Sequence, residues 1–105
     1  MKRIFLTDNS QMWFNEESAT LYKEATYHDG RNWISKATGQ QWEHEALFVT
    51  KGGKFILNRY SNYQGTTETY EAMQKEDAIL WLARNEYGDE AESFDDSGIL
   101  SSYEA

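Results

Sequence analysis

Short runs of apolar and β-prone residues, separated by turn residues, fill the first two thirds of the chain. Lys2–Thr7 predicts an opening strand, and Met12–Phe14 predicts its return arm. Ala19–Tyr27 and Arg31–Lys36 predict a second pair of strands, because Asp29-Gly30 between them readily supplies the positive φ of a tight turn. The pattern therefore favours antiparallel hairpins over helices in this part of the chain.

The strongest strand signal comes from two runs in the middle of the chain. Glu45–Thr50 and Lys54–Tyr60 are both rich in β-prone residues, and they flank Lys51-Gly52-Gly53. Two such arms around a pair of glycines are typical of a hairpin. The polar stretch Ser61–Gly65 then predicts a turn, and Thr66–Met73 predicts one further strand.

After residue 74 the apolar spacing changes to that of a helix. Ala78, Trp81 and Leu82 recur with the spacing of one helix face and predict a helix over about 75–87. Acidic residues in its first turn and a basic residue near its last suit the helix dipole. Gly88 is well placed to end the helix.

These elements predict an α+β fold, with a small antiparallel twisted sheet of four to six strands and one C-terminal helix packed on one face. Residues 1–87 would form a single domain, and residues 88–105 an acidic, mobile tail. The expected core joins the helix to the strands through Ala78, Ile79, Trp81, Leu82, Leu47, Val49, Ile56, Ile4 and Leu6.

Charge changes the picture of the last segment. Residues 85–105 hold seven of the 18 acidic residues and none of the ten Lys or Arg residues, so they carry −7 of the formal net charge of −8. The remaining chain is almost neutral, and an argument from acidity applies to the tail alone.

Composition excludes several classes of protein. The chain has no Cys, which excludes disulfides, thiolate chemistry and cysteine zinc sites. It has no run of about 18 apolar residues and no stretch typical of a secretory signal. We therefore expect a cytoplasmic protein that does not enter a membrane.

Two histidines are the first candidates for chemistry. Glu43, His44 and Glu45 are adjacent, but on a strand His44 faces away from both carboxylates, so the three side chains do not converge on one metal ion. We interpret them as solvated charges. His28 stands in a predicted turn and is interpreted as an ordinary exposed residue. The sequence predicts no metal and no cofactor.

Catalytic motifs are also missing. The chain has no G-x-S-x-G, no S-x-x-K and no P-loop, and Gly52-Gly53 precedes a strand, whereas a phosphate-binding loop precedes a helix. Carboxylate pairs such as Glu68 and Glu71 occur, but nothing in the sequence marks them as buried or tuned. We do not expect an enzyme.

The acidic tail also contains apolar residues, which a purely solubilising tail does not need. Acidic residues interleaved with apolar anchors suit a segment that orders on binding a protein, and regularly spaced carboxylates are able to occupy a groove built for phosphates. The predicted partner-binding residues are Glu86, Asp89, Glu90, Glu92, Phe94, Asp95, Asp96, Ile99, Leu100 and Tyr103.

The alternative function is nucleic-acid binding, with the sheet as a platform and the tail as its regulator. Rings beside cations are the combination that stacks unpaired bases. The residues of this alternative surface are Lys51, Lys54, Arg59, Tyr60 and Tyr63. An aromatic sheet surface would serve equally as a homodimer interface, so the oligomeric state stays open.

One resemblance adds a biological setting. The pattern consists of Glu45-x-Leu47-x-x-Thr50-x-x-Gly53-x-Phe55-x-Leu57 followed by Glu76-x-Ala78-x-x-Trp81-Leu82. It resembles short bacterial proteins of phages, plasmids and other mobile elements, and it covers roughly residues 19–85. Phe48 and Phe55 stand where those proteins have Tyr and Trp. The resemblance implies a small accessory protein that inhibits a larger host machine, such as a nucleic-acid-handling defence complex.

Overall fold

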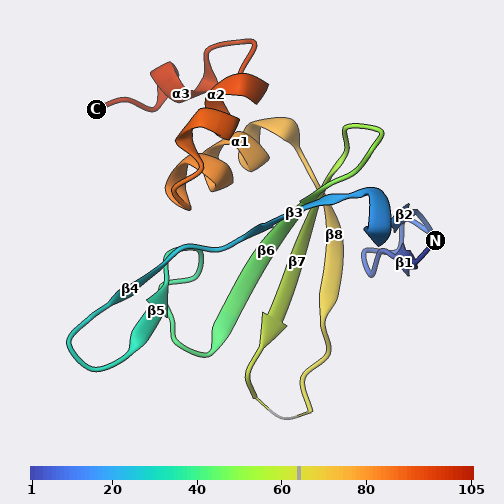
Figure 1. Ribbon diagram of the computed structural model, residues 1–105, viewed down its shortest axis with the longest axis horizontal. Coiled ribbons are helices and arrows are strands. Elements are labelled where there is room, and N and C mark those ends of the chain that lie inside the picture. Colours follow the sequence, from blue (N-terminus) through green and yellow to red (C-terminus); the bar gives the residue numbers. More distant parts are fainter. Residues whose placement is uncertain (64) are drawn as a thin grey trace.

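The computed structural model describes residues 1–63 and 65–105 and combines antiparallel sheets with three α-helices in those residues (Figure 1). The mixed α and β class predicted from the sequence is confirmed. Within the same two ranges, no helix is long and apolar enough to cross a lipid bilayer. The strands are β1 (Arg3–Phe5), β2 (Trp13–Asn15), β3 (Thr20–Lys23), β4 (Thr26–His28), β5 (Trp33–Ser35), β6 (Glu43–Val49), β7 (Phe55–Ser61) and β8 (Thr69–Met73). The helices are the 3-10 turn η1 (Glu16–Ser18), α1 (Lys75–Arg84), α2 (Gly88–Phe94) and α3 (Ile99–Ser102).

Four antiparallel strands form the central sheet in the order β3-β6-β7-β8. The predicted β6–β7 hairpin is confirmed, and its register places Val49 opposite Phe55. The turn between the two strands is stabilised by residues within the turn itself. Gly53 has a φ of 81°, which favours glycine, and Thr50 Oγ1 accepts a hydrogen bond from the backbone N–H of Lys54 at 3.0 Å.

The other strands do not all join this sheet. β1 and β2 form one separate two-stranded sheet, and β4 and β5 form another. The single strand predicted over Ala19–Tyr27 is wrong, because it breaks into β3 and β4 at Glu24 and Ala25. The backbone N–H of Ala25 donates to the Asn85 side chain at 3.0 Å instead of continuing a ladder. The predicted turn at Ser61–Gly65 includes Gln64, which lies outside the described residues.

The central sheet is covered on both faces. Successive residues of a strand point to opposite sides, so neighbouring residues enter different apolar clusters. Leu47 and Leu57 pack with the helices in the larger core cluster. Ile56 packs with Leu6 in a smaller cluster under the β1–β2 hairpin, and Ile4 borders it. The expectation that Ile56, Ile4 and Leu6 meet the helix is therefore wrong. These three residues form a second core on the opposite face.

Helix α1 begins at Lys75 and ends three residues before its predicted end. Asn85 caps it, and Glu86 adopts a left-handed conformation with a φ of 70°, so that the N–H of Tyr87 bonds to the carbonyl of Leu82 at 2.8 Å. Gly88 was expected to terminate the helix but is the first residue of α2. The side chain of Asn85 donates to the Trp81 carbonyl at 2.8 Å and so satisfies a backbone group at this end of the helix.

The predicted single helix followed by a tail outside the fold is also wrong. Residues 88–105 contribute α2 and α3, and these two helices lie beside α1 (Figure 1). Ala91 is 0% exposed within the larger core cluster, and Phe94 packs edge-on against Phe55 with 5.3 Å between ring centroids. The acidic segment folds because its few apolar residues fall on the face that meets the core.

Candidate functional site

Exposed aromatic rings gather at the end of the molecule away from the helices. Tyr27 and Trp33 belong to the β4–β5 hairpin, while Trp42 directly precedes β6 and Tyr63 follows β7; these segments all lie opposite the helices (Figure 1). Their exposed fractions are 45% for Tyr27, 65% for Trp33, 43% for Trp42 and 55% for Tyr63. We call these four residues the aromatic end.

Three rings of the aromatic end, those of Trp33, Trp42 and Tyr63, each contact another ring. Trp33 meets His28 edge-on across the β4–β5 hairpin with 5.2 Å between ring centroids, and Trp42 and Tyr63 lie 5.4 Å apart. The hairpin turn is fixed by the Asp29 carboxylate, which accepts hydrogen bonds from two backbone N–H groups at 2.8 and 2.9 Å. The same bonds lower the pKa of Asp29, with the bond from Asn32 as the main cause.

A buried carboxylate joins this hairpin to the central sheet. Glu24 lies at the break between β3 and β4, and its side chain is 7% exposed. It accepts hydrogen bonds from the Ser35 hydroxyl at 2.8 Å and from the Glu45 backbone N–H at 2.7 Å. Its other oxygen contacts His44 Nδ1 at 2.6 Å. Glu24 therefore ties β5 and β6 to the same point.

His44 is fully engaged as well. Its Nε2 lies 2.9 Å from the Asn62 side-chain nitrogen, and its ring stacks on Tyr60 with 5.4 Å between centroids. Burial raises the pKa of Tyr60, with a further contribution from Glu24. Both ring nitrogens are therefore engaged by neighbouring side chains. The interpretation of His44 as solvated charge is wrong, and its bonding supports a structural role.

A polar cleft of about 530 Å³ lies beside α1 and contains a second carboxylate group. Glu45 accepts a hydrogen bond from Trp81 Nε1 at 2.9 Å and meets Arg59 Nε at 3.2 Å. Arg59 also meets Glu71 at 3.1 Å. Each of these carboxylates thus has a cationic partner. In residues 1–63 and 65–105, no group of three or more His, Asp or Glu side chains is placed to hold a metal ion.

The predicted partner-binding residues of the acidic segment divide into two kinds. Phe94, Ile99 and Leu100 pack against the core, so they are not free anchors. Asp95 bonds to the backbone N–H groups of Ile99 at 2.7 Å and Leu100 at 2.9 Å, and these bonds lower its pKa. Tyr103 is 62% exposed, with its hydroxyl 3.4 Å from Glu76.

The carboxylates of the acidic segment are not all free. Glu86 pairs with Lys36 at 3.4 Å, and Asp96 pairs with Lys75 at 3.1 Å. Across the described ranges, no ion pair involves the three α2 carboxylates, namely Asp89, Glu90 and Glu92. A folded helix therefore presents negative charge at the end of the molecule opposite the aromatic end.

The predicted nucleic-acid surface is not one surface. Lys51 and Lys54 flank the β6–β7 turn, whereas Tyr63 lies beyond the far end of β7, a strand that is itself roughly 20 Å long. Arg59 is held by its two carboxylates, and Tyr60 is covered by the His44 ring. The structure thus separates Lys51 and Lys54 from the exposed ring of Tyr63.

Sequence reasoning missed Glu24, Trp33 and Trp42 as site residues. No local signal points to Glu24, because its partners stand 11, 20 and 21 residues away. The exposed tryptophans were indistinguishable from core residues by type alone. When the chain was compared with protein-family models, curated proteins and solved structures, no match was found.

Proposed function

We propose that this chain is a non-enzymatic protein-binding module that meets its partner through the aromatic end. One observation carries the proposal: two exposed tryptophans, Trp33 and Trp42, each with a second ring packed against it, lie at the same end of the molecule. Tryptophan and tyrosine dominate the binding energy of protein interfaces. Rings left this exposed are typical of a contact surface.

The rings are also fixed before any partner arrives. The Asp29 turn defines the β4–β5 hairpin, and the buried Glu24 carboxylate ties that hairpin to β6. Side chains that are already ordered lose less conformational entropy on binding. The hydrogen bonds of Glu24 and His44 therefore hold the segments of the aromatic end in place.

In its specific form, the proposal is an inhibitor of a nucleic-acid-handling bacterial defence complex, encoded by a phage or mobile element and acting in the host cytoplasm. The unpaired carboxylates of α2 support it, since a rigid helix holds them at fixed spacing. Such a charged end steers a protein towards a basic groove and occupies positions that phosphates otherwise take. The resemblance to mobile-element proteins supplies the setting.

The alternative, nucleic-acid binding, is supported by the same exposed rings, which are suited to stacking bases. The charge distribution favours a protein partner instead. Residues 1–84, which bear the aromatic end, hold ten Lys or Arg against eleven Asp or Glu, so they have no net positive charge to attract a polyanion. Lys51 and Lys54 near the β6–β7 turn are far from the aromatic end.

Pull-down from the native host tests the proposal with three full-length proteins: wild type, the double variant Trp33→Ala/Trp42→Ala, and Phe5→Ala. Phe5 is 59% exposed on the β1–β2 hairpin, so it serves as the matched control for loss of an exposed ring. We expect wild type and Phe5→Ala to retain a host protein that the double variant loses. All three forms of the chain should show the same thermal melt by circular dichroism. Equal retention by all three would contradict the proposed surface.

Titration of labelled single- and double-stranded oligonucleotides at two salt concentrations separates the two functions. We expect no binding at either salt concentration. Tight binding that weakens with salt and is lost in Trp33→Ala/Trp42→Ala would establish the nucleic-acid alternative, because phosphate contacts are salt-dependent.

A further inference from the structure

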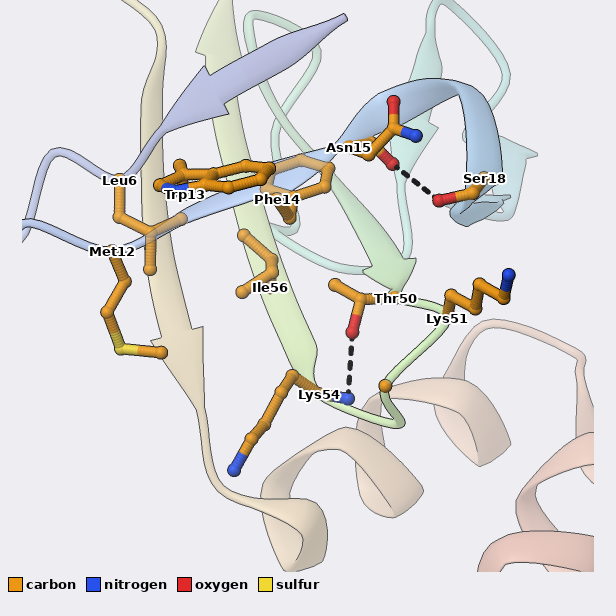
Figure 2. Close-up of a pocket in the computed structure, with 11 residues that line it drawn as sticks. Leu6, Met12, Trp13, Phe14, Asn15, Ser18, Thr50, Lys51, Lys54 and Ile56 are labelled. Atoms are coloured by element: carbon orange, nitrogen blue, oxygen red, sulfur yellow. Dashed lines mark hydrogen bonds between the residues drawn. The ribbon is translucent and has the colours of Figure 1, made fainter. Parts of the chain in front are cut away.

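A cavity of about 230 Å³ lies between the β1–β2 hairpin and the β6–β7 turn, on the opposite side of the sheet from the helices. Figure 2 shows the rings of Trp13 and Phe14 above Ile56, with Leu6 and Met12 further to the left. Its floor belongs to the smaller core, since Leu6, Phe14 and Ile56 are all buried. The cavity is a hollow that the short hairpin leaves above the sheet.

Two lysines stand at the rim of this apolar hollow. Lys51 and Lys54 both line the cavity, and Figure 2 shows them extending from the β6–β7 turn in different directions. In the described residues, neither ammonium group takes part in an ion pair, whereas Lys2, Lys36 and Lys75 do. In a chain with a net charge of −8, this is a local site of unpaired positive charge.

The size of the cavity indicates what it accepts. Pockets that enclose drug-sized molecules usually measure about 300–1,000 Å³. The volume of about 230 Å³ instead suits one large apolar side chain. A second cavity, of about 340 Å³, shares Met12, Lys54 and Ile56 with the first, so the hollow continues as a groove towards β8. A groove with a single-side-chain pocket fits a peptide segment better than an enclosed small molecule.

We propose that this groove binds a segment of a partner protein in which one large apolar side chain is flanked by carboxylates. The apolar side chain fills the cavity over Phe14 and Ile56, while the flanking carboxylates meet Lys51 and Lys54. Met12 closes the contact, because its unbranched thioether side chain adapts to different shapes. The site is separate from the aromatic end, and it shares with the proposed function only the premise that the partner is a protein.

Nuclear magnetic resonance titration of the full chain tests this with three synthetic hexapeptides, capped at both ends. The first is Glu-Asp-Phe-Leu-Asp-Glu, the second replaces its acids by Gln and Asn, and the third replaces Phe-Leu by Ser-Ser. We expect saturable shifts of the amides of β2 and of residues 50–54 with the first peptide, weaker binding of the second, and no shifts at β2 with the third.

Charge variants provide the matched comparison. In Lys51→Gln/Lys54→Gln, affinity for the acidic peptide should fall about three- to tenfold, as expected for the loss of two exposed ion pairs. It should then equal the affinity of the wild-type chain for the uncharged peptide. Lys23→Gln/Arg31→Gln removes the same charge at two exposed residues that do not line the cavity, and should leave the affinity unchanged. All four substitutions are at exposed positions, so the fold should persist.

Three outcomes would overturn the proposal. Equal binding of the acidic and uncharged peptides would remove the role of the lysines. Shifts confined to the β4–β5 hairpin and residues 42 and 63 would place peptide binding at the aromatic end, which supports the proposed function and excludes the groove. Shifts at β2 with octanoate but with none of the peptides would make the cavity a site for small amphipathic carboxylates.

Discussion

The two faces of the central sheet are closed in different ways. The helix-covered face buries a cluster of eight residues, including Leu47, Ile79 and Leu82, which are at most 1% exposed. The hairpin-covered face buries four, and a cavity remains beside them. Three helices supply enough apolar side chains to fill the space above one face, whereas a hairpin of two three-residue strands does not.

The means of attachment differ as well. On the helix face, apolar packing is reinforced by the bond between Trp81 and Glu45. On the hairpin side, the small apolar cluster is reinforced by polar contacts to the edge strand β8. The backbone N–H of Thr7 donates to the Tyr70 carbonyl at 2.7 Å, and Asp8 accepts from the Ala72 N–H at 3.0 Å. The well-filled face therefore stabilises the fold, while the incompletely filled face is left with room for a ligand.

Replacing Trp81 by Ala should have the largest effect. Trp81 is 3% exposed, and its loss should lower the free energy of unfolding by about 3–5 kcal/mol, enough to unfold much of a small domain. Chemical denaturation followed by circular dichroism measures this. Trp81→Phe should cost less, because most of the ring remains. A cooperative melt of the Ala variant near the wild-type midpoint would show that the helix face does not dominate stability.

Replacing Phe14 by Ala should have a smaller and more local effect. Phe14 is 5% exposed and packs on Phe48 at 5.1 Å, so its loss should cost about 3 kcal/mol, the lower end for such a change. Hydrogen exchange should show loss of protection at the β1–β2 hairpin while α1 stays protected. Equal loss of protection in both elements would mean that the two faces unfold as one unit.

High pH should affect the hairpin side. Burial, followed by the nearby Glu68 carboxylate, raises the pKa of Tyr70 to about 12, whereas an unfolded tyrosine titrates near about 10. Because the pKa of Tyr70 is higher in the folded chain than in the unfolded chain, its neutral hydroxyl contributes fully to the stability of the fold below about pH 10. This contribution is lost as the pH rises through about 12. Magnetic resonance of ¹³Cζ-labelled tyrosine should show a titration near pH 12 that is absent in Tyr70→Phe. A Tyr70 signal that titrates with the exposed tyrosines would contradict this.

The smallest effect concerns the helix side at low pH. Backbone N–H groups, chiefly that of Leu100, lower the pKa of Asp95 below its ordinary value. The ionised Asp95 carboxylate therefore stabilises α3 at pH values above the ordinary aspartate pKa of about 4. This stabilisation is lost as the pH falls through the lowered pKa. Amide shifts of Ile99 and Leu100 should follow that titration and lose it in Asp95→Asn. Unchanged pH dependence in Asp95→Asn would assign the titration to another group.

Local structure could be predicted from the sequence wherever its cause is local. The β6–β7 hairpin was predicted because Gly52-Gly53 and the β-prone arms on either side act over a few residues. The start of α1 at Lys75 followed from the change of apolar spacing. The end of α1 could not be predicted, because Asn85 leaves the helix to bond Ala25, which lies 60 residues away.

The candidate sites depend on contacts between distant residues, and prediction failed there. Phe94, Ile99 and Leu100 were taken for free anchors, since an apolar residue in an acidic segment looks the same whether it meets its own core or a partner. The five residues of the nucleic-acid alternative are close in sequence, but a strand of seven residues holds them apart. Cavities cannot be seen in a sequence at all, because they are defined by what neighbouring elements fail to fill.

By itself, the sequence determined the class of the fold, the central hairpin, the main helix and the concentration of negative charge in residues 85–105, because propensity, spacing and charge are local properties. Only the tertiary structure decided that Glu24 meets His44, that Ile56 faces the β1–β2 hairpin, and that Lys51 and Lys54 border a hollow. Strand register decides which way His44 and Ile56 face, because a shift of one residue would turn either side chain to the opposite face. The positions of Glu24 and the two lysines depend on how segments distant in the sequence pack together.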